Sequence, residues 1–154
     1  RAEWTLAGPS SYELLYRSGA GLTPRPLRRI ASGGELSRVM LASKVVLGNA
    51  DGVDTLVFDE VDAGVGGSTA RALASVLADL AATHQVIVVT HLAQVAVMAD
   101  KHYVVSKEPG DVPQTLLDEV TGEARTAEIA RMLSGDQSEA SLAHAKQMLK
   151  EARG

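Results

Sequence analysis

The segment Ser-Gly-Gly-Glu at residues 32–35 has the composition of an anion site at the start of a helix. Ser32 and Glu35 have the spacing of a capping box, in which each side chain binds a backbone N–H that the helix leaves unpaired. Gly33 and Gly34 cost the helix up to about 1 kcal/mol each relative to alanine, but they leave its positive end free of side chains. The pattern favours a phosphate or another anion here, and an ordinary helix cap is the alternative.

An acid pair, Asp59 and Glu60, directly follows the apolar run at residues 55–58. Such a run is typical of a strand buried on both faces of a parallel sheet, and ligands bind at the carboxyl ends of such strands. An aspartate there can hold Mg²⁺ through water, and the adjacent glutamate can orient or deprotonate an attacking water. A solvated strand end is the alternative, although the following loop at residues 62–67 is rich in glycine.

His91 follows the next apolar run, residues 86–89, after Thr90. Because this run comes one helix after the first, we expect the imidazole near the acid pair, at the same edge of the sheet. A lone histidine is more often structural than catalytic, but this position favours a functional role. The other histidines have no ligand-like partners in the sequence and are interpreted as structural: His84, His102 and His144. The chain has no cysteine and no H-E-x-x-H motif, which argues against zinc.

Alternating short apolar runs and amphipathic segments predict the elements that position these side chains. We expect strands at residues 12–16, 55–58, 86–89, 102–106 and 115–120, and helices at 34–47, 68–82, 92–99, 123–133 and 138–152. Residues 18–26 and 62–67 predict loops, 48–52 predicts the stop of the first helix, and 107–112 predicts a turn. The rhythm of strand, helix and strand predicts an α/β fold with a parallel sheet and right-handed crossovers.

Length and composition bound the class of protein. The chain has 154 residues, 45% of them hydrophobic, a net charge of −4 and no cysteine. This suits one domain with a real core and excludes disulfide scaffolds, thiolate zinc sites and cysteine nucleophiles. The net charge argues against duplex binding through bulk positive charge, although it allows a local basic patch. No apolar run reaches the roughly 20 residues of a membrane span, and the N-terminus lacks a signal-peptide pattern, so we expect a cytoplasmic protein with no membrane partner.

The order of these segments resembles the second half of an ABC-type ATPase head. Residues 32–35 resemble the signature motif of that family, residues 56–60 resemble Walker B with the catalytic glutamate, and His91 matches the switch histidine. Longer stretches resemble a bacterial DNA-repair family within the SMC-like group of these ATPases: residues 30–41 (IASGGELSRVML), 58–67 (FDEVDAGVGG), 90–96 (THLAQVA), 99–107 and 142–145. The likeness covers nearly the whole chain, and Gly66 stands where many ABC proteins end the D-loop in aspartate.

The resemblance implies that residues 1–154 form the C-terminal lobe of an ABC/SMC-like ATPase head. It implies an α/β lobe with a mostly parallel sheet flanked by helices, the signature helix on the N-terminal side, and closing helices at about 123–152. It also implies ATP and Mg²⁺ as cofactors, and ATP hydrolysis in the recombinational repair of DNA double-strand breaks as the function. By resemblance the catalytic residues are Glu60 and His91, Asp59 holds Mg²⁺ through water, and the cofactor-binding residues are Ser32, Gly33, Gly34, Glu35, Asp59 and Asp62.

The resemblance further implies partners. The chain contains no G-x-x-x-x-G-K-[ST] motif, so the phosphate-binding loop is expected in an N-terminal Walker A half of the same protein, and residue 1 is not expected to be the natural start. A second head is expected to dimerise on ATP, with residues 32–34 pointing away toward the nucleotide of that neighbour. DNA is expected as a partner, either indirectly or through a basic cluster: Arg17, Arg25, Arg28 and Arg29. A solvated loop that balances local acids is the alternative for that cluster. We expect a nucleoid-associated protein with a coiled coil elsewhere.

Two other functions stay open. A non-catalytic ABC-like module that only dimerises or docks predicts no ATPase activity after the Walker A half is restored. A different Mg²⁺-dependent α/β hydrolase, using Asp59, Glu60 and His91 within this chain, predicts metal-dependent activity from the chain alone.

Overall fold

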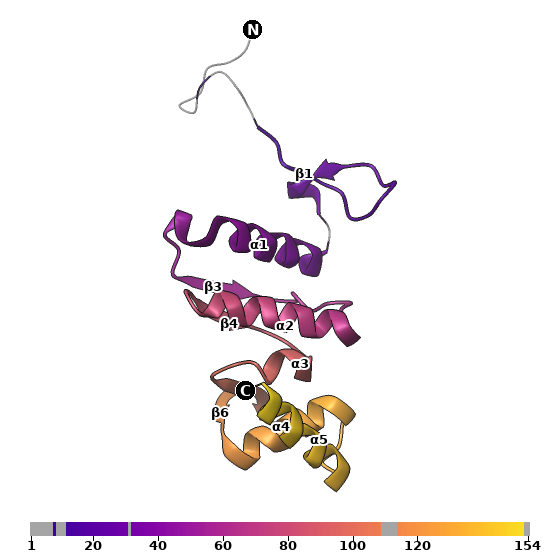
Figure 1. Ribbon diagram of the computed structural model, residues 1–154, viewed down its shortest axis with the longest axis vertical. Coiled ribbons are helices and arrows are strands. Elements are labelled where there is room, and N and C mark those ends of the chain that lie inside the picture. The colour runs from indigo at the N-terminus through magenta and orange to yellow at the C-terminus, as the bar shows by residue number, and fades with distance from the viewer. Residues whose placement is uncertain (1–7, 9–11, 31, 109–113, 153–154) are drawn as a thin grey trace.

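The computed structural model describes residue 8 and residues 12–30, 32–108 and 114–152. Its elements follow one another along the long axis of the molecule in about the order of the chain (Figure 1). A small hairpin comes first, then a helix beside a two-stranded sheet with a second helix, and then a group of closing helices. The candidate site residues lie in the middle of this arrangement.

The first strands form a short antiparallel pair. β1 (Leu15–Tyr16) pairs with β2 (Arg25–Pro26), and the 3₁₀ helix η1 (Leu27–Arg29) follows. The strand expected at 12–16 is therefore shorter, and the expectation of a loop through all of 18–26 is wrong at its last two residues. Proline is accepted in β2 because an edge strand does not need every N–H for the ladder.

Helix α1 (Gly33–Leu47) begins within one residue of the predicted start. The Ser32 hydroxyl oxygen accepts a hydrogen bond from the Glu35 N–H at 3.4 Å, which is one half of the capping box. The helix ends at Gly48, whose φ of 55° suits glycine, and the 3₁₀ helix η2 (Gly48–Asp51) follows. The predicted helix and its glycine stop are confirmed.

The centre of the fold is a parallel pair of strands. β3 (Thr55–Phe58) pairs with β4 (Gln85–Val88), and α2 (Gly67–Ala81) forms the crossover between them. Leu56 and Phe58 belong to a core cluster to which α1 and α2 contribute Leu41, Ala74, Leu77 and Leu80. The two expected strands, their parallel pairing and the helix between them are confirmed.

One face of this pair is exposed, which corrects the prediction of strands buried on both faces. Val57 is 66% exposed and Ile87 is 46% exposed, whereas Leu56 and Phe58 are 7% and 4% exposed. Alternate residues of a strand point to opposite faces. Within the described chain, the helices cover only the face of β3 that carries Leu56 and Phe58.

The C-terminal elements are a hairpin and two helices. The short helix α3 (Ala93–Ala96) leads to β5 (His102–Glu108), which pairs antiparallel with β6 (Gln114–Val120) along its whole length. α4 (Gly122–Ser134) and α5 (Glu139–Glu151) close the described chain. The expected closing helices are confirmed, and the helix expected at 92–99 is shorter.

The mostly parallel sheet that was expected is not formed by the described residues. They form three two-stranded sheets, of which only the β3–β4 pair is parallel. β5 pairs with the strand that follows it and not with β4, because a local hairpin closes a short loop at little entropic cost. Of the turn expected at 107–112, residues 107 and 108 lie in β5, and residues 109–112 lie outside the described residues.

A second core holds α3 against the closing helices. Ile129 and Ala130 of α4 cluster with Ala145 of α5 and with the apolar side of α3. Arg125, which is 6% exposed, reaches across from α4 and donates from Nη2 to the carbonyl oxygens that end α3: Ala96, Val97 and Ala99, at 3.2, 3.3 and 2.6 Å. These bonds hold the chain that leaves α3 against α4. No helix among the described residues combines the length and apolar character that a membrane crossing requires.

Candidate functional site

The acid pair and the histidine lie at one edge of the parallel pair. Asp59 and Glu60 directly follow β3, and His91 follows β4 three residues after Val88, the register partner of Phe58. The Val89 N–H donates to the Phe58 carbonyl oxygen at 2.9 Å, so the two chains stay together beyond the strands. The expected common edge is confirmed, while the chemical roles of these residues stay predictions.

Glu60 occupies an unusual backbone conformation. Its φ is 55°, and it is the one non-glycine residue of the described chain with a positive φ. The left-handed region costs a residue with a Cβ about 1–2 kcal/mol. The turn that imposes it is closed by a hydrogen bond from the Ala63 N–H to the Glu60 carbonyl oxygen at 2.9 Å. Strain of this kind persists where the surrounding contacts fix the backbone, often at functional sites.

The Glu60 carboxylate reaches the start of α1. A Cβ built on Gly33 would lie 2.5 Å from Oε2 of Glu60. The expectation that the diglycine turn points away from its own acid pair is therefore wrong for this chain. An anionic carboxylate is favoured beside the positive end of a helix, so the contact has a simple electrostatic reason.

Two side chains of α1 fix the acid-bearing turn, and neither was predicted from the sequence. The Ser37 hydroxyl donates to the Asp59 carbonyl oxygen at 2.6 Å. The Arg38 guanidinium donates from Nη1 to the carbonyl oxygens of Val61 and Ala63 at 3.1 and 2.9 Å. Their spacing from Gly34, three and four residues, places all three on one face of the helix, and that spacing is the signal that could have revealed them.

Gly34 is required by the same packing. A Cβ on it would lie 2.8 Å from both the Ala63 Cβ and the Glu60 carbonyl oxygen. Side chains do not make contacts this short, so the turn approaches α1 only because this position is glycine. The second glycine of the motif therefore has a structural role within the chain, beside its predicted role in binding.

Asp62 is buried and faces the chain that leaves β4. It is 1% exposed, and its Oδ2 accepts hydrogen bonds from the Thr90 hydroxyl at 2.5 Å and from the His91 N–H at 3.2 Å. The same oxygen lies 3.3 Å from Nδ1 of His91. The described partners of this carboxylate are thus Thr90 and His91. The contact of Asp62 with a cofactor, which the resemblance implied, stays a prediction.

The residues present fit magnesium bound together with a nucleotide, and do not fit a metal site made of protein alone. Among the described residues, no group of three or more histidine, cysteine, aspartate or glutamate side chains is placed to hold a metal ion. Mg²⁺ keeps several waters and is commonly bound by one or two carboxylates with substrate phosphates. Asp59 is exposed at the end of β3 and can supply that single carboxylate.

The remaining predicted side chains lie around this centre or outside it. Ser32 is exposed, Glu35 is half-buried, and both belong to the cap of α1. Of the basic cluster, Arg28 pairs with Glu13 at 2.7 Å, which supports a loop that balances local acids at that position. His84 is 7% exposed, and its Nδ1 lies 2.9 Å from the Thr83 hydroxyl, as expected for a structural histidine.

His102 also has a structural environment. Burial is the largest cause that lowers its pKa, the nearby charge of Arg125 lowers it further, and Glu128 opposes both. Its position at the start of β5 is away from the acid pair in the chain.

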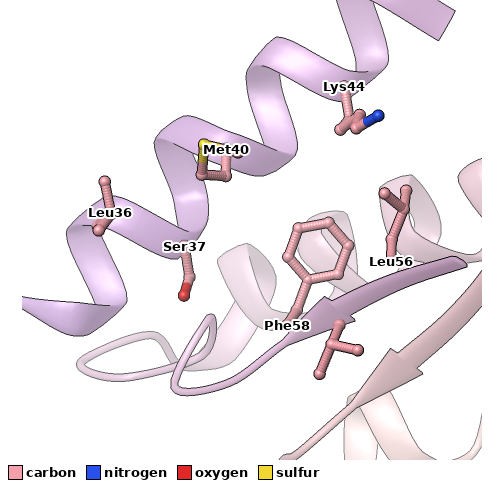
Figure 2. A pocket seen from close by; sticks show the side chains of 7 residues that line it. Leu36, Ser37, Met40, Lys44, Leu56 and Phe58 are labelled. Carbon is pink, nitrogen blue, oxygen red and sulfur yellow. The ribbon is translucent and has the colours of Figure 1, made fainter. Parts of the chain in front are cut away.

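An apolar groove of about 210 Å³ runs between α1 and β3, next to the acid pair. Figure 2 shows Leu36, Met40 and Lys44 of α1 on one side of it and Leu56 and Phe58 of β3 on the other. Lys44 is 7% exposed in this apolar setting.

No family model matches the chain. Curated proteins similar to this chain are found. The DNA repair protein RecN of Treponema pallidum is 52% identical over 145 residues, which is 93% of this chain and 25% of that protein. RecN of Deinococcus radiodurans is 52% identical over 151 residues, and RecN of Streptomyces coelicolor is 48% identical over 149 residues. Each of these two alignments covers 96% of this chain and 26% of the relative.

This chain is homologous to RecN. It spans about a quarter of the length of the RecN relatives that it matches. The resemblance to a bacterial DNA-repair family is thereby confirmed as a similarity along nearly the whole of this chain. Among solved structures, one described as "Structural biochemistry of ATP-driven dimerization and DNA stimulated activation of SMC ATPases" matches 88% of this chain and 69% of that chain, with a TM-score of 0.46 and 21% identity. A TM-score of this size is too low to establish a common fold.

Proposed function

We propose that this chain is the part of a RecN-type ATPase head that carries the signature motif, the acid pair and the switch histidine. In the complete protein it takes part in binding and hydrolysing ATP with Mg²⁺, in the recombinational repair of DNA double-strand breaks. The observation that carries the proposal is the common edge of Asp59, Glu60 and His91, with the start of α1 against the same turn. The similarity to RecN along nearly the whole chain supports it.

Each side chain takes the role that its place allows. Magnesium-bound ATP supplies the phosphoryl group, and catalysis of its transfer rests mainly on positioning and charge stabilisation. Asp59 holds the ion through water. Glu60 orients the attacking water and accepts its proton, and His91 presents its exposed ring to the γ-phosphate. Ser32 and Gly33 are exposed at the positive end of α1, where the Glu60 carboxylate also lies.

The exposed apolar face beside this site is assigned to the Walker A half of the same protein. Val57, Ile87 and Val89 are 66%, 46% and 58% exposed on the uncovered side of β3 and β4. Leu36 and Met40 lie on the other side of β3, across the groove of Figure 2 from Leu56 and Phe58, and are 41% and 48% exposed. Apolar side chains gathered on an uncovered sheet face are typical of an interface in soluble proteins. The chain itself has no phosphate-binding loop, so the covering partner also supplies the missing chemistry.

A second head is assigned to the exposed side of Ser32 and Gly33, whose other side faces the acid-bearing turn of this chain. Binding of ATP closes this dimer and hydrolysis reopens it. DNA is a partner of the complete protein, either through another part of it or through arginines of the first loop of this chain. Arg17, Arg25 and Arg29 are exposed in that loop. A charge-reversal series on these arginines tests the patch, because loss of phosphate contacts flattens the salt dependence of DNA binding.

The decisive experiment replaces Glu60 in a full-length RecN that carries this sequence. Glu60→Gln keeps the shape of the side chain and removes its charge. We expect ATP turnover to fall by at least about a hundredfold, ATP binding to be retained, and the dimer to persist. Glu139→Gln, an exposed acid at the start of α5, is the matched control and should leave turnover unchanged.

The two alternatives give different results in the same experiment. Normal turnover in Glu60→Gln contradicts the role of this carboxylate. Absence of ATPase activity in the unmodified full-length protein favours a non-catalytic module that docks or dimerises. Metal-dependent hydrolysis by the isolated chain favours a different α/β hydrolase that needs no Walker A half.

A further inference from the structure

Asp62 is the most deeply buried ionisable side chain near the acid pair, and all of its described contacts use one oxygen. The residue is 1% exposed. Its Oδ2 accepts from the Thr90 hydroxyl at 2.5 Å and from the His91 N–H at 3.2 Å, and lies 3.3 Å from the His91 Nδ1. A buried carboxylate is retained in a fold only where hydrogen bonds compensate its lost hydration, and here they come from the residues that follow β4.

The backbone on both sides of Asp62 is held in place. Arg38 donates to the carbonyl oxygens of the preceding residue, Val61, and the following residue, Ala63. The Asp62 carbonyl oxygen itself accepts from the Val65 N–H at 3.0 Å. Val61 is fully buried in the core. The carboxylate is therefore presented to the end of β4 by a rigid turn.

Thr90 and His91, which contact the Asp62 carboxylate, are held in place by the same contact. The Thr90 hydroxyl donates to Asp62 and accepts from the Leu92 N–H at 3.0 Å, where the chain enters α3. The side chain of His91 is 71% exposed, although its Nδ1 faces Asp62. The contact thus lies on the Nδ1 side of the ring, and most of the side chain is exposed at the end of the β3–β4 pair, which we call the open edge.

We propose that Asp62 is a positioning residue that holds His91 with the proton on Nδ1 and with Nε2 presented to the open edge. A carboxylate oxygen 3.3 Å away repels the lone pair of a bare ring nitrogen and attracts an N–H, so the contact favours the tautomer with the hydrogen on Nδ1. A carboxylate behind a functional imidazole fixes its tautomer and orientation in this way. The proposal rests on the proposed function for the role of His91, and gives Asp62 a role other than the predicted contact with a cofactor.

The first test reads the tautomer directly and needs no enzyme activity. The 154-residue chain is labelled with ¹⁵N-histidine, and the His91 signals are assigned by their loss in His91→Gln. At a pH well above about 6.5, where an ordinary histidine is neutral, we expect His91 to carry its proton on Nδ1. We expect this preference to be lost in Asp62→Leu and retained in Asp62→Asn, whose amide oxygen can replace Oδ2. A proton on Nε2 in the unmodified chain overturns the proposal.

A second variant guards against misfolding. If Asp62→Leu does not fold, Asp62→Ala removes the same acceptor without adding bulk. An unchanged Nδ1–H signal in a folded variant that lacks the acceptor also overturns the proposal, because a merely structural aspartate would leave the tautomer as it is. The spectrum of the unmodified chain decides the question even where neither variant folds.

The second test uses ATP turnover by the full-length protein. We expect Asp62→Leu to lower kcat at least about tenfold with little change in KM, and Asp62→Asn to recover most of the loss. Because Asp62 acts through His91, the double variant Asp62→Leu with His91→Gln should be no slower than His91→Gln alone. Losses that multiply overturn the proposal. If the unmodified protein has no ATPase activity, the proposed function fails, and the tautomer measurement still decides the link between Asp62 and His91.

Discussion

The carboxylate of Glu60 lies against Gly33, close enough that a Cβ on this glycine would come to 2.5 Å from Oε2. The two segments that resemble the signature motif and Walker B are therefore in contact within one chain. Ser37 and Arg38 reinforce this contact from the next turn of α1. A change in the first turn of α1 thus reaches the acid pair directly, and the two glycines of that turn should respond differently to substitution.

Gly33→Ala should leave stability intact and disturb the acid pair. The atom that a new methyl group meets is the far end of the flexible Glu60 side chain, which can swing away. Alanine also favours the helix by up to about 1 kcal/mol. We expect urea unfolding of the chain to show an unchanged or slightly raised free energy of unfolding. ATP turnover by the full-length protein should fall at least about tenfold, because the carboxylate is displaced.

Gly34→Ala should instead destabilise the chain by about 1–3 kcal/mol. Here the new methyl group meets the Glu60 carbonyl oxygen and the Ala63 Cβ, both at 2.8 Å, and these atoms move only if the backbone moves. Helix propensity alone predicts the opposite sign. Urea unfolding of the two variants side by side checks the prediction, and an equal response at the two glycines would contradict it.

Glu60→Gly should be more stable than Glu60→Ala by about 1 kcal/mol. Both variants lose the carboxylate, so their difference isolates the backbone, whose φ of 55° suits glycine. The same two substitutions at Glu123, in the first turn of α4, provide the control, because alanine is favoured over glycine within a helix. The measurement is the urea midpoint of the four variants. A more stable alanine variant at position 60 would show that the turn is not strained.

Local signals predicted the parts of the site that lie along one segment. The spacing of Ser32 and Glu35 predicted the cap of α1, and the apolar runs before Asp59 and His91 predicted two parallel strands that end at one edge. The parallel order followed from the helix between them. Each of these features depends on neighbours a few residues away, which a sequence displays directly.

Contacts between distant segments could not be predicted in the same way. The approach of Glu60 to Gly33 depends on the tight packing of a turn on a helix, and no spacing encodes it. The sheet order was wrong because the pairing of β5 with β6 competes with extension of the β3–β4 pair, and the apolar pattern suits both. The apolar run predicted that both faces of β3 are buried, but Val57 is 66% exposed. An apolar run shows that a strand is suited to burial on both faces, and it does not show which element covers each face.

Arg38→Met should destabilise the chain by about 2 kcal/mol. Methionine keeps much of the apolar stem but loses the charged donor shared by the Val61 and Ala63 carbonyl oxygens. Hydrogen exchange should quicken at the Ala63 and Val65 amides, which close the turn. Arg71→Met, at an exposed position of α2, is the matched control and should change neither measurement. Unchanged protection of those amides would show that Arg38 does not hold the turn.

His102 should make the chain less stable in mild acid. Burial and the charge of Arg125 lower its pKa below the usual 6.5, against the opposing effect of Glu128. The unfolded chain therefore binds this proton more readily than the folded chain. The contribution to stability is complete above pH 6.5 and is lost as the pH falls from there toward the lowered pKa. The lowered pKa values of Glu128 and Asp136 act in a separate window, below the ordinary values of 4.5 and 3.8.

The measurement is the urea midpoint of the chain from neutral pH down to about one pH unit below the ordinary histidine value. We expect the midpoint to fall over this range in the unmodified chain and to fall less in His102→Gln, which has no titratable side chain at position 102. His144→Gln, at an exposed position of α5, is the control and should follow the unmodified chain. The surroundings of His102 lower its pKa, so its loss should make the fall shallower. A fall that is as steep in His102→Gln as in the unmodified chain would assign the acid sensitivity to another group.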